Sequence, residues 1–114
     1  SDNTGVYGDK ITGETLKTIK SNDFGIKRLN GAKQLAENGM KESAIVTAKE
    51  IFRKYPETKK DSDNRIYFAD LLYNRGLYEE AYDEFNDMKS LQLSGEQNSY
   101  IKEKLDEIGK KLIK

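Results

Sequence analysis

The chain contains neither cysteine nor histidine, has no tryptophan, and has one proline among its 114 residues. Without cysteine there are no disulfides, no thiolate nucleophile and no cysteine-bound metal. Without histidine the commonest general base and the commonest metal ligand are also missing. The sequence therefore predicts no catalytic residues, no metal site and no cofactor, and we expect a protein that is not an enzyme.

Long apolar runs and an excess of charge of one sign are also lacking. No segment has the roughly 20 consecutive apolar residues that a membrane-spanning helix needs. Lys and Arg number 20, Asp and Glu number 20, and the net charge is zero. A chain without a net field attracts DNA, RNA or an anionic membrane only weakly. We expect no nucleic-acid partner and no small-molecule substrate.

The residues that are present favour helices. Hydrophobic residues make up 35% of the chain and charged residues another 35%, which is typical of a small helical protein with narrow apolar stripes. Apolar residues recur at spacings of three and four, and no long segment alternates apolar with polar residues as a strand would. The sequence therefore predicts an all-α fold.

The N-terminal part of the chain is expected to contain a tail and two helices. Residues 1–12 are predicted to be a flexible tail or linker, ahead of a helical domain over 13–114. A short helix is predicted within "GETLKTIKSND". Asn22 or Asp23 would cap the next helix, which Gly39 would end in a left-handed turn. Gly31 is expected to let a neighbouring helix come close.

Four further helices are predicted in the rest of the chain. Pro56 and Gly76 are expected to act as breaks, and Ser62 or Asp63 is expected to cap the helix that lies between them. Their predicted ranges are about 41–55, 64–74, 78–90 and 98–113.

One phrase occurs twice in the chain, 37 residues apart. "GMKESA", starting at Gly39, aligns with "GLYEEA", starting at Gly76. Helix pairs that recur with a period of about 20 to 50 residues are typical of a solenoid. Its hairpins stack because none of them buries its apolar face alone. The sequence predicts repeats at about 25–58 and 62–95, followed by a capping helix at about 98–113.

The repeated unit resembles the tetratricopeptide repeat (TPR) family. That family has small residues in both helices, glycine at the turn, an aromatic in the second helix and often a final proline. The residues at these positions are Ala32, Gly39, Ala44, Ala48 and Pro56 in the first unit, and Ala69, Gly76, Ala81 and Phe85 in the second. The resemblance implies a right-handed solenoid of antiparallel helix hairpins.

Three features of the chain depart from the family pattern. Ala48 stands where the family has an aromatic residue, and Arg28 and Arg65 stand where it has a large residue. The period of 37 residues exceeds the usual value of about 34. The longer period implies a longer loop near residues 57–61.

The resemblance implies a scaffold that binds a partner protein or peptide in a concave groove lined by the first helix of each unit. An ordinary polar surface is the alternative interpretation of the same residues. The chaperone-tail ligand of some family members is not expected, because Leu29 and Tyr67 occupy positions of its carboxylate clamp. The implied groove residues are Asn30, Lys33, Glu37, Asp70, Tyr73 and Asn74.

The end of the first unit is also similar to repeats of bacterial cell-envelope proteins. These are the lipoprotein that assists outer-membrane protein assembly and the periplasmic coordinator of the Tol-Pal system. The similarity rests on Phe52, Tyr55 and Pro56. It implies a periplasmic or envelope location rather than a cytoplasmic one, with membrane attachment only through an N-terminal tether. The rival hypothesis is a structural segment that self-associates into a homo-oligomer, since two repeats are fewer than the three usually needed.

Partial matches to other motifs are not interpreted as sites. "GDKITGET" nearly matches a phosphate-binding loop, but Glu14 stands where the lysine is required. "DSDNR" resembles the start of a calcium loop, but Arg65 and Ile66 occupy the positions of an oxygen ligand and the glycine. One acidic cluster is interpreted as a solvated helix face: Glu79, Glu80, Asp83 and Glu84.

Overall fold

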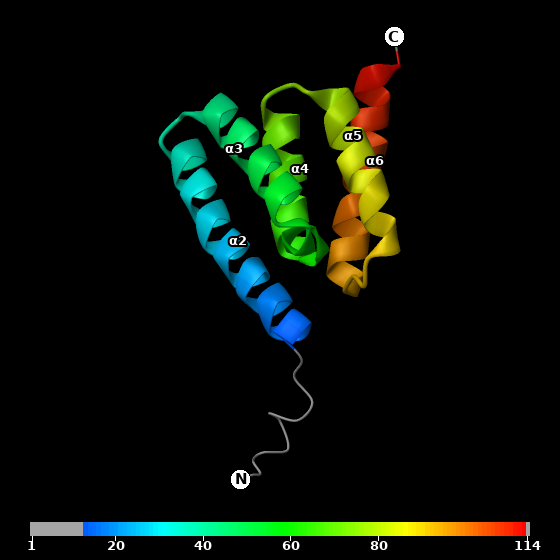
Figure 1. Ribbon diagram of the computed structural model, residues 1–114. Coiled ribbons are helices and arrows are strands. Elements are labelled where there is room, and N and C mark those ends of the chain that lie inside the picture. The colour runs from blue at the N-terminus through cyan, green and yellow to red at the C-terminus, as the bar shows by residue number, and fades with distance from the viewer. Residues whose placement is uncertain (1–12, 114) are drawn as a thin grey trace.

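The computed structural model describes the backbone of residues 13–113 and the side chains of residues 24–113. These residues form α-helices and two short 3₁₀-helices, and they contain no strand, which confirms the all-α prediction (Figure 1). The predicted tail at 1–12 lies outside the described residues. The elements are α2 (Gly13–Glu37), α3 (Lys41–Lys54), η1 (Pro56–Lys60), α4 (Ser62–Asn74), α5 (Tyr78–Asp87), η2 (Met88–Ser90) and α6 (Gly95–Leu112).

Two glycines reverse the chain and create two helix hairpins, α2 with α3 and α4 with α5 (Figure 1). Gly39 has φ of 87° and Gly76 has φ of 83°, in the left-handed region that side chains with a Cβ rarely adopt. In both turns the amide after the glycine donates to the carbonyl five residues earlier, at 2.9 Å. The two glycine turns predicted from the repeated phrase are therefore confirmed, with the same hydrogen bonding.

The predicted break at Asn22 or Asp23, between a short first helix and the next one, is wrong. The backbone is helical from Gly13 to Glu37 without interruption, so neither Asn22 nor Asp23 caps a helix. Asparagine and aspartate cost only about 0.7 kcal/mol inside a helix relative to alanine. That cost is too small to stop a helix when no proline or turn glycine stands beside it.

The connection between the hairpins is more ordered than the predicted polar loop. Pro56 ends α3, as expected, and starts the 3₁₀-helix η1. The cap of α4 is Asp61, whose Oδ1 accepts from the Asn64 amide at 3.0 Å, rather than Ser62 or Asp63. Because η1 occupies the chain up to Lys60, Asp61 is the residue left with extended backbone before the first helical turn.

The last two helices also differ from their predicted ranges. α5 ends at Asp87, and the three residues after it tighten into η2. α6 begins at Gly95, three residues before the predicted start at Asn98, because Ser94 and Gln97 form a capping box. The Ser94 hydroxyl accepts from the Gln97 amide and the Gln97 side chain accepts from the Ser94 amide, both at 3.0 Å. This is the Ser-x-x-Gln signature of a helix start.

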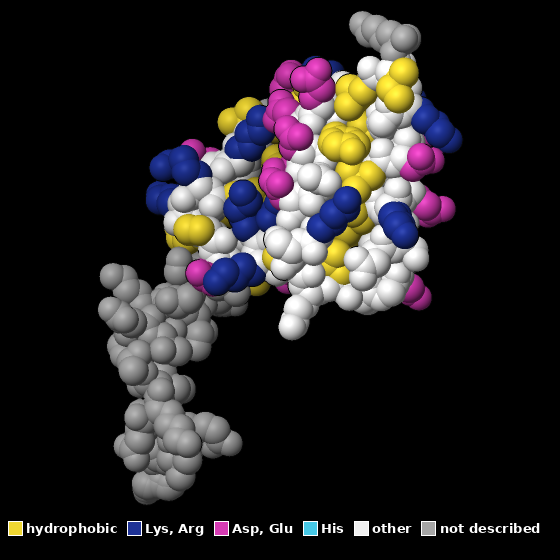
Figure 2. Space-filling model, turned by 90° about the vertical axis from the view of Figure 1, so that its right-hand side faces the viewer, with side chains coloured by type: hydrophobic (Ala, Val, Ile, Leu, Met, Phe, Trp, Pro, Cys, Tyr) yellow, Lys and Arg dark blue, Asp and Glu magenta, His cyan; other side chains and the backbone are white. Residues whose placement is uncertain are grey.

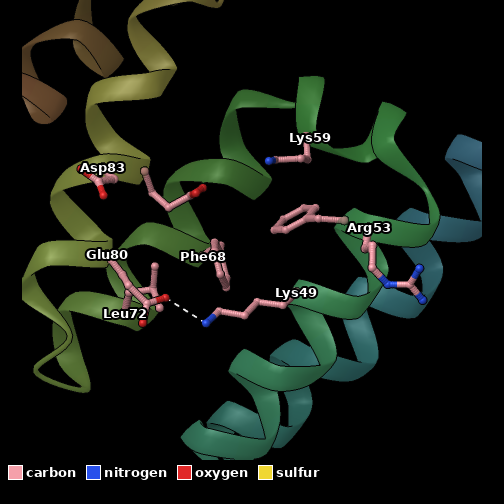
Figure 3. A pocket seen from close by; sticks show the side chains of 9 residues that line it. Lys49, Arg53, Lys59, Phe68, Leu72, Glu80 and Asp83 are labelled. Carbon is pink, nitrogen blue, oxygen red and sulfur yellow. Dashed lines mark ion pairs between the residues drawn. The ribbon is translucent and has the colours of Figure 1, made fainter.

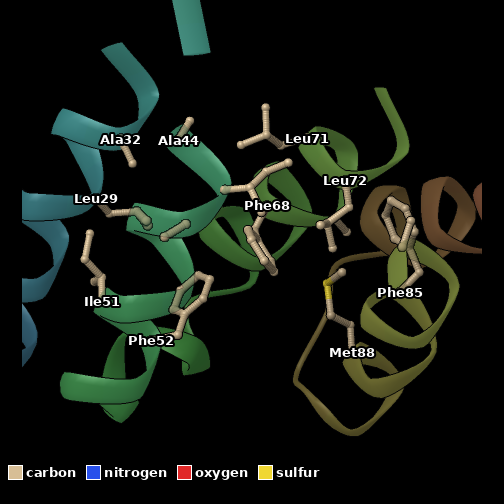
Figure 4. Packing of buried hydrophobic residues seen from close by; sticks show 14 of the residues in the cluster. Leu29, Ala32, Ala44, Ile51, Phe52, Phe68, Leu71, Leu72, Phe85 and Met88 are labelled. Carbon is tan, nitrogen blue, oxygen red and sulfur yellow. The ribbon is translucent and has the colours of Figure 1, made fainter. Parts of the chain in front are cut away.

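One apolar core runs through both hairpins and under α6 (Figure 4). Alanines with at most 2% of their surface exposed lie in all four hairpin helices, and small residues at these positions let helix axes come close. Phe52 of α3 meets Phe68 of α4 edge to face, with ring centres 5.2 Å apart. This aromatic pair joins the first hairpin to the second.

The close approach expected at Gly31 occurs instead at Gly25. A Cβ added to Gly25 would lie 2.3 Å from Thr58 Oγ1 and 2.9 Å from Tyr55 Cβ, whereas a Cβ on Gly31 would meet nothing within 4 Å. Thr58 is fully buried. Gly25 is therefore the position at which η1 and the end of α3 pack directly against the backbone of α2.

We expect Gly25→Ala to lower the free energy of unfolding by about 1–3 kcal/mol, because the added methyl group would displace η1. Gly31→Ala, the matched control, is expected to raise it by up to about 1 kcal/mol, because alanine is the better helix former. Urea denaturation followed by circular dichroism measures both effects. A Gly25→Ala protein as stable as Gly31→Ala would contradict the close approach.

Candidate functional site

Half of the expected groove residues lie together in one hollow. This α2/α4 hollow has a volume of about 300 Å³ and includes Glu37 of α2 with Asp70 and Asn74 of α4. Its other lining residues are Ala36, Lys41, Tyr67 and Leu71. Glu37 and Asn74 are exposed, and Asp70 is partly buried. The hollow thus combines apolar surface with side chains that donate and accept hydrogen bonds.

Lys33 lies beside the hollow and is engaged by α4. Its Nζ donates to Asn64 Oδ1 at 3.3 Å and lies 5.1 Å from the centre of the Tyr67 ring. Burial, together with the charge of Glu37, raises the pKa of the Tyr67 hydroxyl. Lys33 joins the two hairpins. Asn30, the remaining groove residue on α2, is exposed and does not line the hollow.

Asp70 is bonded to the C-terminal helix. The Tyr100 hydroxyl of α6 lies 2.7 Å from Asp70 Oδ1 and 2.8 Å from Oδ2, and it donates to this carboxylate. Burial raises the pKa of Asp70, and the hydrogen bond from Tyr100 and the charge of Lys104 act in the opposite direction. Burial and the neighbouring carboxylate raise the pKa of Tyr100. Asp70 therefore holds α6 against α4 as well as lining the hollow.

Tyr73 is engaged by the same helix. Its hydroxyl donates to Glu107 of α6, and Lys104 Nζ lies 4.2 Å from the centre of its ring. The hydrogen bond to Glu107 raises the pKa of Tyr73 to about 12 and lowers the pKa of Glu107. Tyr73 also packs against Tyr78, with ring centres 5.5 Å apart. Tyr73 therefore contributes to the packing of α6 on α4 and does not line the α2/α4 hollow.

A second hollow was not anticipated from the sequence. This α3/α5 pocket, of about 350 Å³, opens between the hairpins (Figure 3). Phe52, Phe68 and Leu72 form its buried apolar floor. Its charged residues are divided between two walls: Lys49, Arg53 and Lys59 from α3 and η1, and Glu80, Asp83 and Glu84 from α5.

The charges of the α3/α5 pocket are largely paired within the protein. Lys49 Nζ lies 2.8 Å from Glu80 Oε2 across the opening (Figure 3), and Arg53 pairs with Glu50. Both pairs are well exposed, and exposed ion pairs contribute at most about 1 kcal/mol. The pocket is best described as the seam between the hairpins. Its walls come from separate elements, so no single stretch of sequence signals it.

The strongest polar contact of this seam is a buried ion pair. Arg65 Nε donates to Glu84 Oε1 at 3.2 Å, with 8% and 19% of the two side chains exposed, and Arg65 Nη1 donates to the Lys59 carbonyl at 3.3 Å. The interpretation of Glu84 as part of a solvated face is therefore wrong. Its neighbours Glu79, Glu80 and Asp83 are exposed as expected. Glu84 is turned inward because it pairs with the buried guanidinium of Arg65.

Comparison with models of protein families, with curated proteins and with solved structures found no significant match. Among the described residues, no helix combines the length and apolar character needed to cross a membrane. The same residues contain no group of three or more acidic side chains placed to hold a metal ion.

We expect Glu84→Gln to lower the free energy of unfolding by about 1–3 kcal/mol, because it leaves a buried guanidinium without a counter-charge. Glu79→Gln, on the exposed side of the same helix, is expected to change it by no more than about 0.5 kcal/mol. Thermal and urea denaturation test both variants. The double variant Arg65→Met, Glu84→Leu should recover part of the lost stability. If Glu84→Gln and Glu79→Gln changed the free energy of unfolding equally, the buried pair would be contradicted.

The tyrosines that contact α6 are expected to make stability depend on alkaline pH. The pKa of Tyr73 rises from an ordinary value of 10 to about 12 in the folded protein. A raised pKa contributes stability that is fully present below pH 10 and is lost as the pH rises through about 12. Tyr73→Phe should therefore weaken the fall in urea stability between these pH values. Tyr82→Phe serves as the control and should follow the wild type, and parallel pH profiles for all three proteins would contradict the assignment.

Proposed function

We propose that the protein is a scaffold of the tetratricopeptide type, in which the two hairpins and α6 form a short solenoid that binds a partner protein or peptide. The proposal is supported by the equal construction of the two hairpins. Each has buried alanines in both helices and a left-handed glycine at its turn. The described residues offer no set of catalytic groups that would favour another class.

The observation that carries the proposal is the way first helices meet side by side. Lys33 of α2 lies over the ring of Tyr67 of α4. The charge of Lys104 of α6 acts on the carboxylate of Asp70 of α4, where burial raises the pKa and this charge opposes the rise. Lys33 and Asp70 are 37 positions apart, as are Tyr67 and Lys104. From these matched positions we infer that α6 packs on α4 as α4 packs on α2. Repetition of one interface is the basis of a solenoid.

We place the partner in the α2/α4 hollow. The exposed Glu37 and Asn74 lie beside the partly buried ring of Tyr67 and the apolar Leu71. Asn74 offers both a donor and an acceptor for a peptide backbone, and Tyr67 offers an apolar surface with a polar tip. A polypeptide segment that inserts one apolar side chain between polar contacts fits this lining. Asp70 and Tyr73 contribute by fixing α6.

The compartment forms part of the same proposal. Phe52 and Tyr55 precede Pro56 in the arrangement shared with bacterial cell-envelope repeats. Here Phe52 is buried and Tyr55 packs against Phe24 of α2, with ring centres 5.5 Å apart. On this basis we propose a partner in a bacterial envelope assembly.

Site-specific photo-crosslinking in the source cell tests the scaffold function. A crosslinking amino acid at Asn74 is expected to capture a discrete partner, and the same amino acid at the exposed Lys54 of α3 is not. Glu37→Lys should reduce capture at position 74 without changing the thermal unfolding temperature. Variants of Asp70 or Tyr73 are unsuitable, because they would also release α6.

The outcomes of this experiment separate the hypotheses. Equal capture from positions 74 and 54, or capture unaffected by Glu37→Lys, would place the interface outside the hollow. Crosslinks only to further copies of the chain, with a dimer mass by light scattering, would favour the self-associating role over the scaffold.

A further inference from the structure

A third surface, distinct from both hollows, lies on the outer side of the last two helices. α5 and α6 run antiparallel (Figure 1), and between them opens a groove of about 390 Å³. We call it the α5/α6 groove. Figure 2 views this side of the molecule and shows a stripe of hydrophobic side chains with charged side chains on either side. The hollow to which the scaffold function is assigned lies between α2 and α4 and shares no residue with this groove.

The α5/α6 groove has an uncharged floor between charged side chains. Tyr82 of α5 is half-buried, Leu105 of α6 belongs to the core with 8% of its surface exposed, and Ile113 lies at one end with 78% of its surface exposed. Gly109 interrupts the row of side chains on α6. A Cβ added there would meet nothing within 4 Å. The groove is therefore open at its centre, where another backbone can approach closely.

The charged residues around the groove are mainly basic. Lys89, Lys102 and Lys110 line it together with Asp106. Lys110 Nζ lies 3.4 Å from Asp106 Oδ2, so that pair is internally neutral. Within the described part of the chain, neither Lys89 nor Lys102 forms an ion pair. On a chain whose net charge is zero, this local excess of positive charge gives the groove a preference for carboxylates.

We propose that the α5/α6 groove binds an amphipathic α-helix of a partner protein, with an apolar stripe against Tyr82 and Gly109 and carboxylates toward Lys89 and Lys102. A groove between two antiparallel helices takes a third helix by ridge-into-groove packing. Helices that insert an apolar face are a recurring mode of recognition. From Lys102 to Ile113 the groove follows α6 for about 16 Å, at about 1.5 Å per residue, which matches three helical turns.

A second copy of the chain fits this groove less well. A two-fold dimer would bring the same patch of both copies together. Lys89 and Lys102 of one copy would then face lysines of the other, and contact between like charges opposes association. Charge complementarity thus favours a partner helix whose apolar stripe is bordered by Glu or Asp.

The test uses two designed helical peptides of 16 residues with identical leucine stripes, one bordered by glutamates and one by lysines. Titration into the ¹⁵N-labelled full chain is followed by amide chemical shifts. The glutamate peptide is expected to give saturable shifts centred on Tyr82, Leu105 and Gly109. The lysine peptide is expected to bind at least about fivefold more weakly, which corresponds to roughly 1 kcal/mol of charge pairing.

Matched variants locate the binding. Gly109→Gln places a side chain in the groove at a position where the added Cβ meets nothing within 4 Å, and it should abolish the shifts. Gly31→Gln, at a second helical glycine with open space around its Cβ, should leave them unchanged. Lys102→Glu should weaken binding about fivefold through loss of a charge pair, and Lys54→Glu, on the exposed surface of α3, should have no effect. Glu37→Lys should also have no effect, since the scaffold hollow is separate.

Three results would overturn the proposal. The first is an absence of saturable shifts with the glutamate peptide. The second is equal affinity for both peptides, or binding that survives Gly109→Gln. The third is a change of the same amides with protein concentration alone, which would assign the groove to a second copy.

Discussion

A guanidinium buried in a small helical protein must find a counter-charge and carbonyl oxygens, and Arg65 finds them on two separate elements. Glu84 of α5 supplies the charge and Lys59 of η1 supplies the carbonyl. α4 is thereby fixed to the other helix of its hairpin and to the segment that arrives from the first hairpin. Leaving this guanidinium without its counter-charge costs about 1–3 kcal/mol, so arrangements that bury similar apolar area but separate these groups are disfavoured.

The contacts that stack the helices also determine which surfaces remain for partners. Lys33 engages α4, and Asp70 and Tyr73 engage α6. The polar residues at these helix contacts therefore support the architecture, and the surfaces left for recognition lie next to them. The α2/α4 hollow and the α5/α6 groove lie on opposite helices of the second hairpin, α4 and α5. One hairpin could thus hold two different polypeptides at the same time.

Features controlled by one dominant residue were predictable from sequence. Glycine alone tolerates the backbone at Gly39 and Gly76, and Pro56 has no amide with which to continue α3. The Ser-x-x-Gln pattern of the Ser94–Gln97 capping box is also visible in the sequence, and it marks a helix start three residues before the predicted one at Asn98. Features that depend on a distant partner were not predictable. The sequence around Gly25 does not distinguish it from Gly31, because the close approach at Gly25 is made by the distant Thr58. Glu84 likewise resembles its exposed neighbours in sequence, and only its pairing with Arg65 sets it apart. For the same reason, half of the expected groove residues lie in the hollow and Tyr73 belongs to the α6 contact.

The short helix η1 has a mechanical consequence. Its five residues are held from both sides, by the close fit of Thr58 against Gly25 of α2 and by the bond from Arg65 of α4 to the Lys59 carbonyl. A connection held from two sides by separate helices is expected to be stiff. The two hairpins are then expected to move together rather than independently. Two partners bound to this protein would therefore be held at a fixed distance and orientation to each other.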